Sequence, residues 1–342
     1  MRVAIAYNEP TVPQMEEALR EYEANMALYD AVECVERACE QNGWNVSRAI
    51  VGSDPAALSD AASRADVVVN FVEAIQDDAR FESAAAWLLE WIGVPFTGSP
   101  GLALSLALDK SIAKACLATA GVRVAAGCVV AGEGDPIPRL RYPLIVKPVR
   151  EDASIGIESG SVVYGEPAAR AQAARIIERF HQPALIEEFI EGRDVTAALL
   201  TRGASGEPPE LLPISEFDYT NLPAGEPRIL TYDAKWDVAS AAYMGSPAVY
   251  PDDLKTDTVA RIGSVARDAW DAIGLRDYAR VDMRVPPDGP PVVIDVNPNP
   301  DLSTTAGFAG AAARVGISYE TLIRRIVEGA LARGRTAPRV GP

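Results

Sequence analysis

Two apolar segments near the end of the chain each finish in polar side chains of the kind that bind metal ions. The segment ARVDMRV carries Arg280 and Asp282, and VVIDVNPNPD carries Asp295 and Asn297. Because alternate residues of a strand share a face, each of these pairs is expected on one face of an antiparallel strand pair. Two carboxylates and an amide oxygen suit Mg²⁺, with Mn²⁺ as an alternative, and leave positions for water and phosphate oxygens. The same pattern also fits a hairpin whose polar ends are simply hydrated.

Two lysines earlier in the chain supply the opposite charge. Lys110 begins a predicted helix after LALD, and Lys147 closes the apolar strand YPLIVKP. A charge that follows four apolar residues is costly unless it has a partner, and phosphate is a suitable partner for lysine. The next segment, REDASIGIE, carries Ser154 and Gly156 in a loop whose backbone N–H groups are suited to fold over phosphates. A hydrated strand end is the alternative interpretation of Lys147.

The segment LIEEFIEGRDV has the pattern of a hinge between two subdomains. Its alternation places Glu187 and Phe189 on one face and Glu188 on the other. A carboxylate next to apolar groups is suited to accept an exocyclic amine and to hold a flat base.

Several other designs are excluded or disfavoured. No segment fits the Walker A pattern, and no GxGxxG follows a strand. His181 is the only histidine, so a Ser-His-Asp hydrolase or a His-rich metal site would have to use it. Its place in ERFHQP favours a surface residue at the end of a helix. The four cysteines form no CxxC pair and are expected to be reduced core thiols without zinc.

Bulk properties narrow the class of protein further. A chain of 342 residues exceeds what one hydrophobic core usually supports, so two or three subdomains are expected. The net charge of −16 argues against nucleic acid and against an anionic membrane surface as partners. The first residues show no export signal and no apolar run approaches a membrane span, so a cytoplasmic protein is expected.

The elements that must position these side chains fall into three groups. Strands and helices alternate through the first hundred residues, which predicts a parallel α/β layer. The middle predicts an α+β unit with a helix N-capped by Asp109, and the last part predicts a second α+β unit. Expected strands cover 3–7, 44–50, 66–71, 124–130, 143–148, 161–164, 184–189, 195–201, 211–215, 278–285 and 291–296, and expected helices cover 14–41, 82–92, 166–181 and 252–273. A structureless connection over 216–250 is interpreted as a lid or binding loop.

Taken together, these segments resemble the ATP-grasp superfamily, and within it the D-alanine–D-alanine ligase branch. The resemblance covers about residues 94 to 330 and lies in six ordered motifs, which are GVPFTGSP with LALDKSIAK, YPLIVKPVREDASIGIE, LIEEFIEGRDVT, LTYDAKW, ARVDMRV with VVIDVNPNPDLS, and GISYETL. It implies an N-terminal substrate domain over 1–105, a central ATP-grasp subdomain over 106–192 and a C-terminal subdomain with the metal site over 193–335. A homodimer is a family-level expectation.

The resemblance also implies roles for individual residues. Lys110 and Lys147 match the lysines that contact the ATP phosphates, and Ser154 and Gly156 match the phosphate loop. For the nucleoside, Glu187 matches the acceptor of the adenine amine, Phe189 and Ile190 the hinge beside the base, and Asp194 the ribose-binding acid. Lys235 matches the lysine of a mobile loop over the γ-phosphate, Asp282, Asp295 and Asn297 the magnesium ligands, and Arg280 the cation that steadies the acyl phosphate and tetrahedral states.

Departures from the family pattern concern the substrate. The usual glutamate at the second metal position is Asp295, and Asp301 stands where the family has a glycine. The N-terminal segment NEPTVPQMEEALREYE replaces the run that holds the first D-alanine, and NFVEAIQDDARFES replaces a His-Gly-rich loop of the family. Glu9 and Glu73 of these segments, together with Asp301, are therefore candidate substrate contacts. The favoured hypothesis is an ATP-dependent ligase that joins the carboxylate of an amino acid or small specialised metabolite to an amine. D-alanine–D-alanine ligation and a catalytically silent ATP-binding module are the alternatives.

Overall fold

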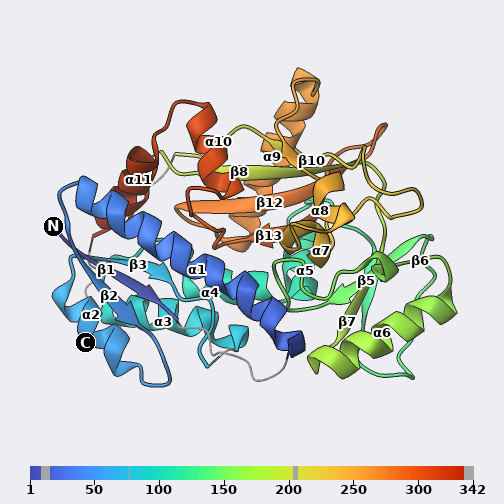
Figure 1. Cartoon of the computed structure of the whole chain (residues 1–342), viewed down its shortest axis with the longest axis horizontal. Coiled ribbons are helices and arrows are strands. Elements are labelled where there is room, and N and C mark those ends of the chain that lie inside the picture. The colour runs from blue at the N-terminus through green and yellow to red at the C-terminus, as the bar shows by residue number, and fades with distance from the viewer. Residues whose placement is uncertain (9–15, 77, 203–206, 335–342) are drawn as a thin grey trace.

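The computed structural model describes residues 1–8, 16–76, 78–202 and 207–334 (Figure 1). Three sheets carry the fold, and helices cover them, which confirms the predicted α/β (α+β) class. We propose boundaries near residues 105 and 192, which assign one sheet to each of the three units.

The first sheet has three parallel strands in the order β2-β1-β3. Its strands are β1 (Arg2–Tyr7), β2 (Asn45–Ile50) and β3 (Val67–Phe71), and its neighbouring helices are α1 (Glu16–Gln41), α2 (Ala56–Arg64), α3 (Glu82–Ile92, after the 3-10 turn Ala79–Phe81) and α4 (Gly101–Leu108). Every residue of β3 is buried because helices cover both faces of the sheet. Continuous apolar strands such as VVVNF are typical of parallel sheets covered in this way.

The second sheet has four antiparallel strands in the order β4-β7-β5-β6. Its strands are β4 (Gly127–Val130), β5 (Leu144–Pro148), β6 (Val162–Val163) and β7 (Ala184–Glu188). Helix α6 (Glu166–Phe180) packs on it, the 3-10 turn Ser159–Ser161 precedes β6, and α5 (Lys110–Thr119) leads into the unit from α4. The predicted cap is confirmed, because the Asp109 carboxylate accepts from the N–H groups of Ser111 and Ile112.

The third sheet has six strands, with β11-β10-β8-β12-β13 in order and β9 paired to β8. Its strands are β8 (Arg193–Leu200), β9 (Glu210–Leu211), β10 (Ser215–Phe217), β11 (Ala248–Val249), β12 (Tyr278–Val285) and β13 (Val292–Asn297). Helix α9 (Thr256–Ile273) covers one face, where Val281 and Met283 are fully buried. The opposite face therefore presents the alternate residues Arg280, Asp282 and Arg284.

Several expectations about elements need correction. The strand predicted over 211–215 is two short strands, β9 and β10, because Pro213 lacks the N–H that a continuous ladder needs. The connection 216–250 is not structureless, since it contains α7 (Tyr232–Trp236), α8 (Ala241–Gly245) and β11. The four cysteines are free as expected, but Cys116 and Cys128 are only half-buried. His181 is exposed at the end of α6, which confirms the surface interpretation.

The last two helices of the chain pack against each other, and the final one also packs on β3 of the first sheet and on α1 (Figure 1). Phe308 of α10 (Gly307–Arg314) and Leu322 of α11 (Tyr319–Ala332) share one core with Ile5 and Phe71. The start and the end of the chain therefore build one hydrophobic core. No helix within the described ranges is long and apolar enough to cross a membrane.

The buried carboxylate of Asp277 links the end of the last helix to the segment around Gly98, and this contact leads to a stability prediction. Asp277, 1% exposed, accepts from the Gly98 N–H at 2.9 Å and pairs with both Nη atoms of Arg333 beyond α11. Asp277→Asn is expected to lower the free energy of unfolding by about 2–3 kcal/mol, because charged hydrogen bonds in a buried site are lost. Chemical denaturation measures this loss. Asp66→Asn is the matched control, since Asp66 pairs with Arg2 at the exposed surface, and an equal loss there would contradict the expectation.

Candidate active site

Strands β12 and β13 bring the predicted metal ligands together. Asp282 is the direct register partner of Asp295, and Arg280 is the partner of Asn297. Opposite residues of an antiparallel pair have their side chains on the same face, with Cβ atoms about 5 Å apart. A bulge follows, because Met283 pairs with Val293 and leaves Ile294 as an extra residue. The two carboxylates therefore converge on one face of the sheet, as the alternation in sequence predicted.

The charges around the two carboxylates differ. Burial raises the pKa of Asp282, and the charge of Arg280 only partly offsets it. Burial would also raise the pKa of Asp295, but Lys110 and Lys147 outweigh it and the pKa is lowered. Thr196 Oγ1 and Arg280 Nη2 donate to Asp282 at 2.9 and 3.0 Å. Asp295 therefore lies in the more positive part of the cleft.

The donor set at this corner is suited to a hard divalent cation. Two carboxylates and the Asn297 amide supply oxygen atoms only, and Asn297 Oδ1 is oriented by the N–H of Asn299 at 2.8 Å. In the described part of the chain, no three His, Cys, Asp or Glu side chains gather as a metal-binding group. A site here would therefore leave several coordination positions to water and phosphate oxygens, as Mg²⁺ prefers.

Three lysines and one glutamate form a buried charged cluster beside the carboxylates. Lys114 Nζ lies 2.6 Å and Lys147 Nζ 3.0 Å from the carboxylate of Glu187, which is 2% exposed. Burial lowers the pKa of Lys114, and burial of Glu187 is outweighed by the two lysines, which lower its pKa. Lys110 Nζ lies 3.2 Å from Asp152 and 3.7 Å from Asp295. Glu187, matched by resemblance to the acceptor of the adenine amine, here pairs with two lysines.

The predicted phosphate loop adopts a backbone that few side chains favour. Ala153 and Ser154 have φ values of 54° and 63°, and Gly156 has φ 76°. A Cβ at Gly156 would lie 2.5 Å from the ring of Pro148, so glycine is required there on steric grounds as well. The Trp236 ring N–H donates to the Ala153 carbonyl at 2.9 Å. Helix α7 therefore lies directly over this loop.

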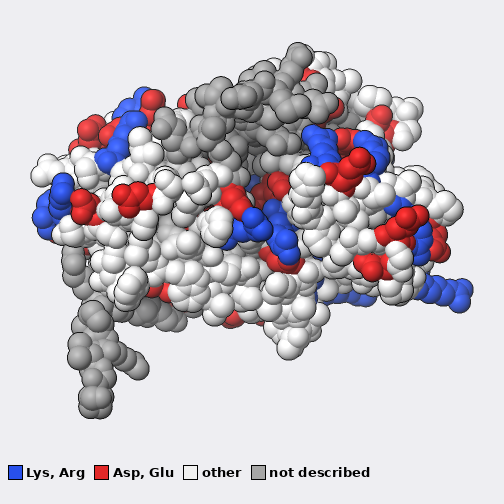
Figure 2. Space-filling view, turned by 90° about the horizontal axis from the view of Figure 1, so that it is seen from below, with Lys and Arg blue, Asp and Glu red and all other residues white. Residues whose placement is uncertain are grey.

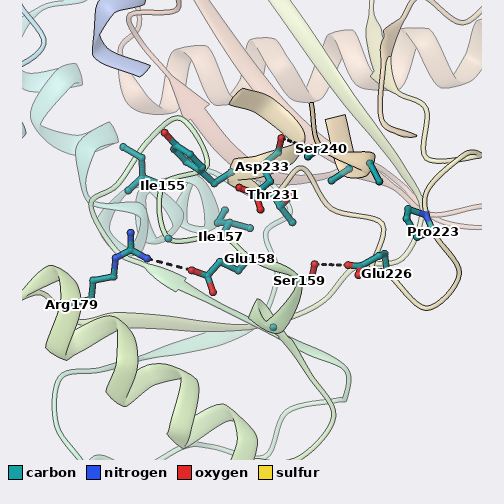
Figure 3. A pocket seen from close by; sticks show the side chains of 15 residues that line it. Ile155, Ile157, Glu158, Ser159, Arg179, Pro223, Glu226, Thr231, Asp233 and Ser240 are labelled. Atoms are coloured by element: carbon teal, nitrogen blue, oxygen red, sulfur yellow. Dashed lines mark hydrogen bonds and ion pairs between the residues drawn. The ribbon is translucent and has the colours of Figure 1, made fainter. Parts of the chain in front are cut away.

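Further contacts join the connection over residues 216–250, here called the lid segment, to the phosphate loop. The Tyr232 N–H donates to the Ile157 carbonyl at 2.9 Å, and the Ser159 hydroxyl donates to Glu226. Figure 3 shows the cavity of about 460 Å³ between the two segments, with the Ser159–Glu226 and Arg179–Glu158 contacts at its edge. Among the predicted site residues, only Gly156 lines this cavity.

Lys235 of α7 lies among charges of both signs. Its ammonium is 5.1 Å from the centre of the Trp236 ring. Burial, and secondly the charge of Arg280, lower the pKa of Lys235 to about 8, although Asp282, Asp152 and Asp301 act in the opposite direction. The lysine is thus close to the Arg280–Asp282 pair.

The hinge residues open onto a larger cavity of about 1200 Å³, lined in part by Phe189, Asp194, Tyr219 and Arg284. Asp194 is buried and accepts from Tyr219 Oη at 2.7 Å, while Arg284 Nη2 lies 3.0 Å from the same carboxylate. Ile190 is half-buried beside Phe189. This cavity is large enough to hold a nucleoside.

Two carboxylates that were predicted to contact the substrate lie near each other, Glu73 in the first unit and Asp301 after β13. Burial, and then the charges of Asp301 and Asp152, raise the pKa of Glu73 to about 7. Water reaches the Glu73 side chain, so the effect is that of a cleft rather than a closed core. The Asp301 carboxylate accepts from the Ser303 N–H and hydroxyl at 2.7 and 2.9 Å. Glu9 lies outside the described residues.

Some residues of the site were missed in the sequence. Lys114 follows Lys110 by one helical turn, so the i, i+4 spacing was a usable signal. Glu82 begins α3, and its pKa is raised well above the usual range, by burial first and then by Asp152 and Glu73. Asn299 bonds Glu82 and also accepts from Tyr278 Oη at 3.1 Å. Glu82 on α3 and Tyr278 on β12 lie far apart in the sequence, so no local pattern reveals that both bond Asn299.

One face of the molecule carries charged side chains of both signs. Figure 2 shows basic and acidic side chains mixed on one face of the molecule, including a group of both signs near its middle.

Known proteins share both the sequence and the fold. Residues 135–328 match the family model described as D-ala D-ala ligase C-terminus. The D-alanine–D-alanine ligase of Gluconobacter oxydans is 32% identical over 86% of this chain and 91% of its own length. The uncharacterized protein y4sG of Sinorhizobium fredii is 34% identical over 78% of this chain and 75% of its own.

Among solved structures, the D-alanine–D-alanine ligase of Bacillus anthracis has the same fold. It gives a TM-score of 0.73 at 20% identity, and 0.71 at 21% identity in its complex with ATP, with 98% of both chains covered in each case. The matched family model spans more than half of the chain and contains the β12–β13 corner described above. The chain therefore belongs to the D-alanine–D-alanine ligase family, and it is an ATP-dependent carboxylate–amine ligase with the ATP-grasp fold.

Proposed function

We propose that this ligase joins the carboxylate of a small amino acid or specialised metabolite to an amine through an acyl phosphate. The observation that carries the proposal is the register of Asp282 with Asp295, on the face that also presents Arg280 and lies beside Lys110 and Lys235. Positive groups surround two carboxylates there, which is the arrangement that phosphoryl transfer needs.

The first step would form the acyl phosphate. A substrate carboxylate oxygen attacks the γ-phosphorus of ATP, the bond to the β-γ bridging oxygen breaks, and ADP leaves. Lys110 and Lys147 would hold the phosphates, the loop with Ser154 would cover them, and Lys235 would neutralise charge on the transferred group. Asp282, Asp295 and Asn297 would hold Mg²⁺, which would offset the negative charge of the phosphates.

The second step would form the amide. The amine attacks the acyl carbon, phosphate leaves, and the amine loses its proton. Arg280 is placed to steady the negative oxygen of the tetrahedral state, because its Nε is buried and has no hydrogen-bond partner among the described residues. A donor left unpaired in a buried site is costly, so an anion would satisfy it.

The acidic surroundings of the substrate side favour an amino acid. Glu73 and Asp301 lie close enough that the charge of Asp301 raises the pKa of Glu73. A substrate ammonium group would relieve this repulsion. Because the relative from Gluconobacter oxydans is a D-alanine–D-alanine ligase, D-alanine is the second candidate, and it is supported if D-alanine alone permits ADP release.

A screen for ADP release tests the proposal. The protein is incubated with ATP, Mg²⁺ and single L- and D-amino acids or small carboxylic acids, and hydroxylamine replaces the unknown amine. We expect ADP and a hydroxamate in equal amounts only when the correct carboxylate is present, because an acyl phosphate reacts with hydroxylamine. Tight ATP binding without turnover across the whole panel would instead indicate a catalytically silent module.

A further inference from the structure

Arg284 is a buried cation to which the resemblance assigns no role and which takes no part in the proposed reaction steps. It is 4% exposed and lies on β12 two residues after Asp282, so it shares the face that presents Arg280 and Asp282. A buried guanidinium is costly unless its donors are satisfied. Its partners therefore indicate what it holds in place.

The partners of Arg284 come from separate parts of the chain. Nη2 lies 3.0 Å from the Asp194 carboxylate on β8 and donates to the Arg228 carbonyl at 2.7 Å. Nη1 donates to the carbonyl of Gly192 in the hinge at 3.4 Å. The guanidinium carbon also lies 5.3 Å from the centre of the Phe189 ring. One side chain thus joins the hinge, the third sheet and the lid segment.

Tyr219 and Arg284 hold the same oxygen atom of the Asp194 carboxylate. Tyr219 Oη and Arg284 Nη2 both contact its Oδ2, at 2.7 and 3.0 Å, so neither uses Oδ1. All three residues line the cavity of about 1200 Å³ next to Phe189. A carboxylate held in this way presents its other oxygen as an acceptor for a sugar hydroxyl.

The segment from Arg228 to Lys235 leads from this cavity toward the predicted phosphate loop. Ile229 follows Arg228 and is 4% exposed, and the Thr231 hydroxyl then caps α7 by accepting from the Ala234 N–H at 3.1 Å. Lys235 is the next residue of this helix. The stretch from Arg228, whose carbonyl accepts from Arg284, to Lys235 is therefore short and anchored at several points.

We propose that Arg284 is a positioning residue that couples recognition of the ribose by Asp194 to the placement of Lys235. It orients the Asp194 carboxylate and, through the Arg228 carbonyl, fixes the segment that enters α7. The inference rests on the proposed function, because it assumes that a nucleoside occupies this cavity. It adds a contact that depends on the ribose hydroxyls and not on the phosphates.

Nucleotide binding by calorimetry tests the inference without requiring turnover. ATP is compared with 2′,3′-dideoxy-ATP in the unaltered protein, Arg284→Gln, Arg284→Lys and Tyr219→Phe. We expect the unaltered protein to bind the dideoxy nucleotide about tenfold more weakly, since hydrogen bonds to a carboxylate are lost. Arg284→Gln should bring this ratio close to one, and Arg284→Lys should restore part of it.

Hydrogen exchange gives the second measurement. ATP should protect the backbone amides of residues 228–236 in the unaltered protein, and this protection should fall in Arg284→Gln. Tyr219→Phe keeps the ring and removes one bond to Asp194, so it tests the ratio even if Arg284→Gln does not fold. Arg267→Gln is the matched control, because Arg267 also bonds two backbone carbonyls, those of Pro209 and Gly263, away from the cleft.

The outcomes separate the two proposals. An unchanged dideoxy ratio in both Arg284→Lys and Tyr219→Phe, or undiminished protection of residues 228–236 in a folded Arg284→Gln, overturns the role of Arg284. If the unaltered protein binds ATP with the expected ratio but forms no amide, the proposed reaction fails and the positioning role stands. If it binds no ATP, both fail.

Discussion

Asp282→Asn is expected to reduce carboxylate- and amine-dependent ADP release by about 10³-fold or more. Asparagine keeps the shape of the side chain but removes the charge that faces Asp295 and bonds Arg280. Charge stabilisation by a bound metal in phosphoryl transfer is worth several kcal/mol, and each 1.4 kcal/mol corresponds to a factor of ten. The measurement is kcat for ADP release as a function of Mg²⁺ concentration.

The dependence on Mg²⁺ separates metal binding from a general loss of structure. Asp282→Asn should need a higher Mg²⁺ concentration for its residual activity, and its thermal midpoint should stay close to that of the unaltered protein. Asp271→Asn, on the exposed side of α9, serves as the control and should change neither value. ATP turnover by Asp282→Asn at the rate of the unaltered protein would rule out the proposed metal corner.

Lys235→Met is expected to lower kcat/KM for ATP by about 10²-fold, because a preorganised cation is lost where charge develops. The unaltered protein should also show a pH dependence of defined sign. The pKa of Lys235 is lowered to about 8, by burial first and then by Arg280, so the ammonium loses its proton as the pH rises through this value. Activity that needs the charged lysine should therefore fall above about pH 8.

Lys235→Arg provides the diagnostic comparison. Arginine stays protonated throughout the accessible range, so the alkaline fall in kcat/KM should disappear or move to higher pH. In the unaltered protein, kcat should fall at a higher pH than kcat/KM, because bound triphosphate stabilises the charged lysine. An alkaline fall that stays in place in Lys235→Arg would assign it to another group.

The sequence predicted the β12–β13 corner because its geometry is local. The alternation of ARVDMRV and VVIDVN fixes which side chains share a face, and only the register had to come from the fold. The pairing of Lys114 with Glu187 could not be predicted, since the two residues lie far apart in the sequence and meet only in the folded chain.

Arg284 illustrates a signal that was present in the sequence but not used. A charge inside an apolar strand requires a partner, and this argument was applied to Lys147 but not to the arginine of VDMRVP. Its partners could not have been named, because Asp194 and Arg228 lie 90 and 56 residues away along the chain. The broken strand around Pro213 was a simpler error, since proline alone indicates the interruption.

The packing of α11 on the first sheet has a consequence for the synthesis of the protein on the ribosome. The strands from the first seventy residues would leave the exit tunnel long before the helices that cover one of their faces. At about 5–20 residues per second, that face waits on the order of tens of seconds for its cover. During this interval only α1 can pack on that face, so apolar side chains such as Phe71 stay partly uncovered, which makes the nascent chain a natural client for chaperones.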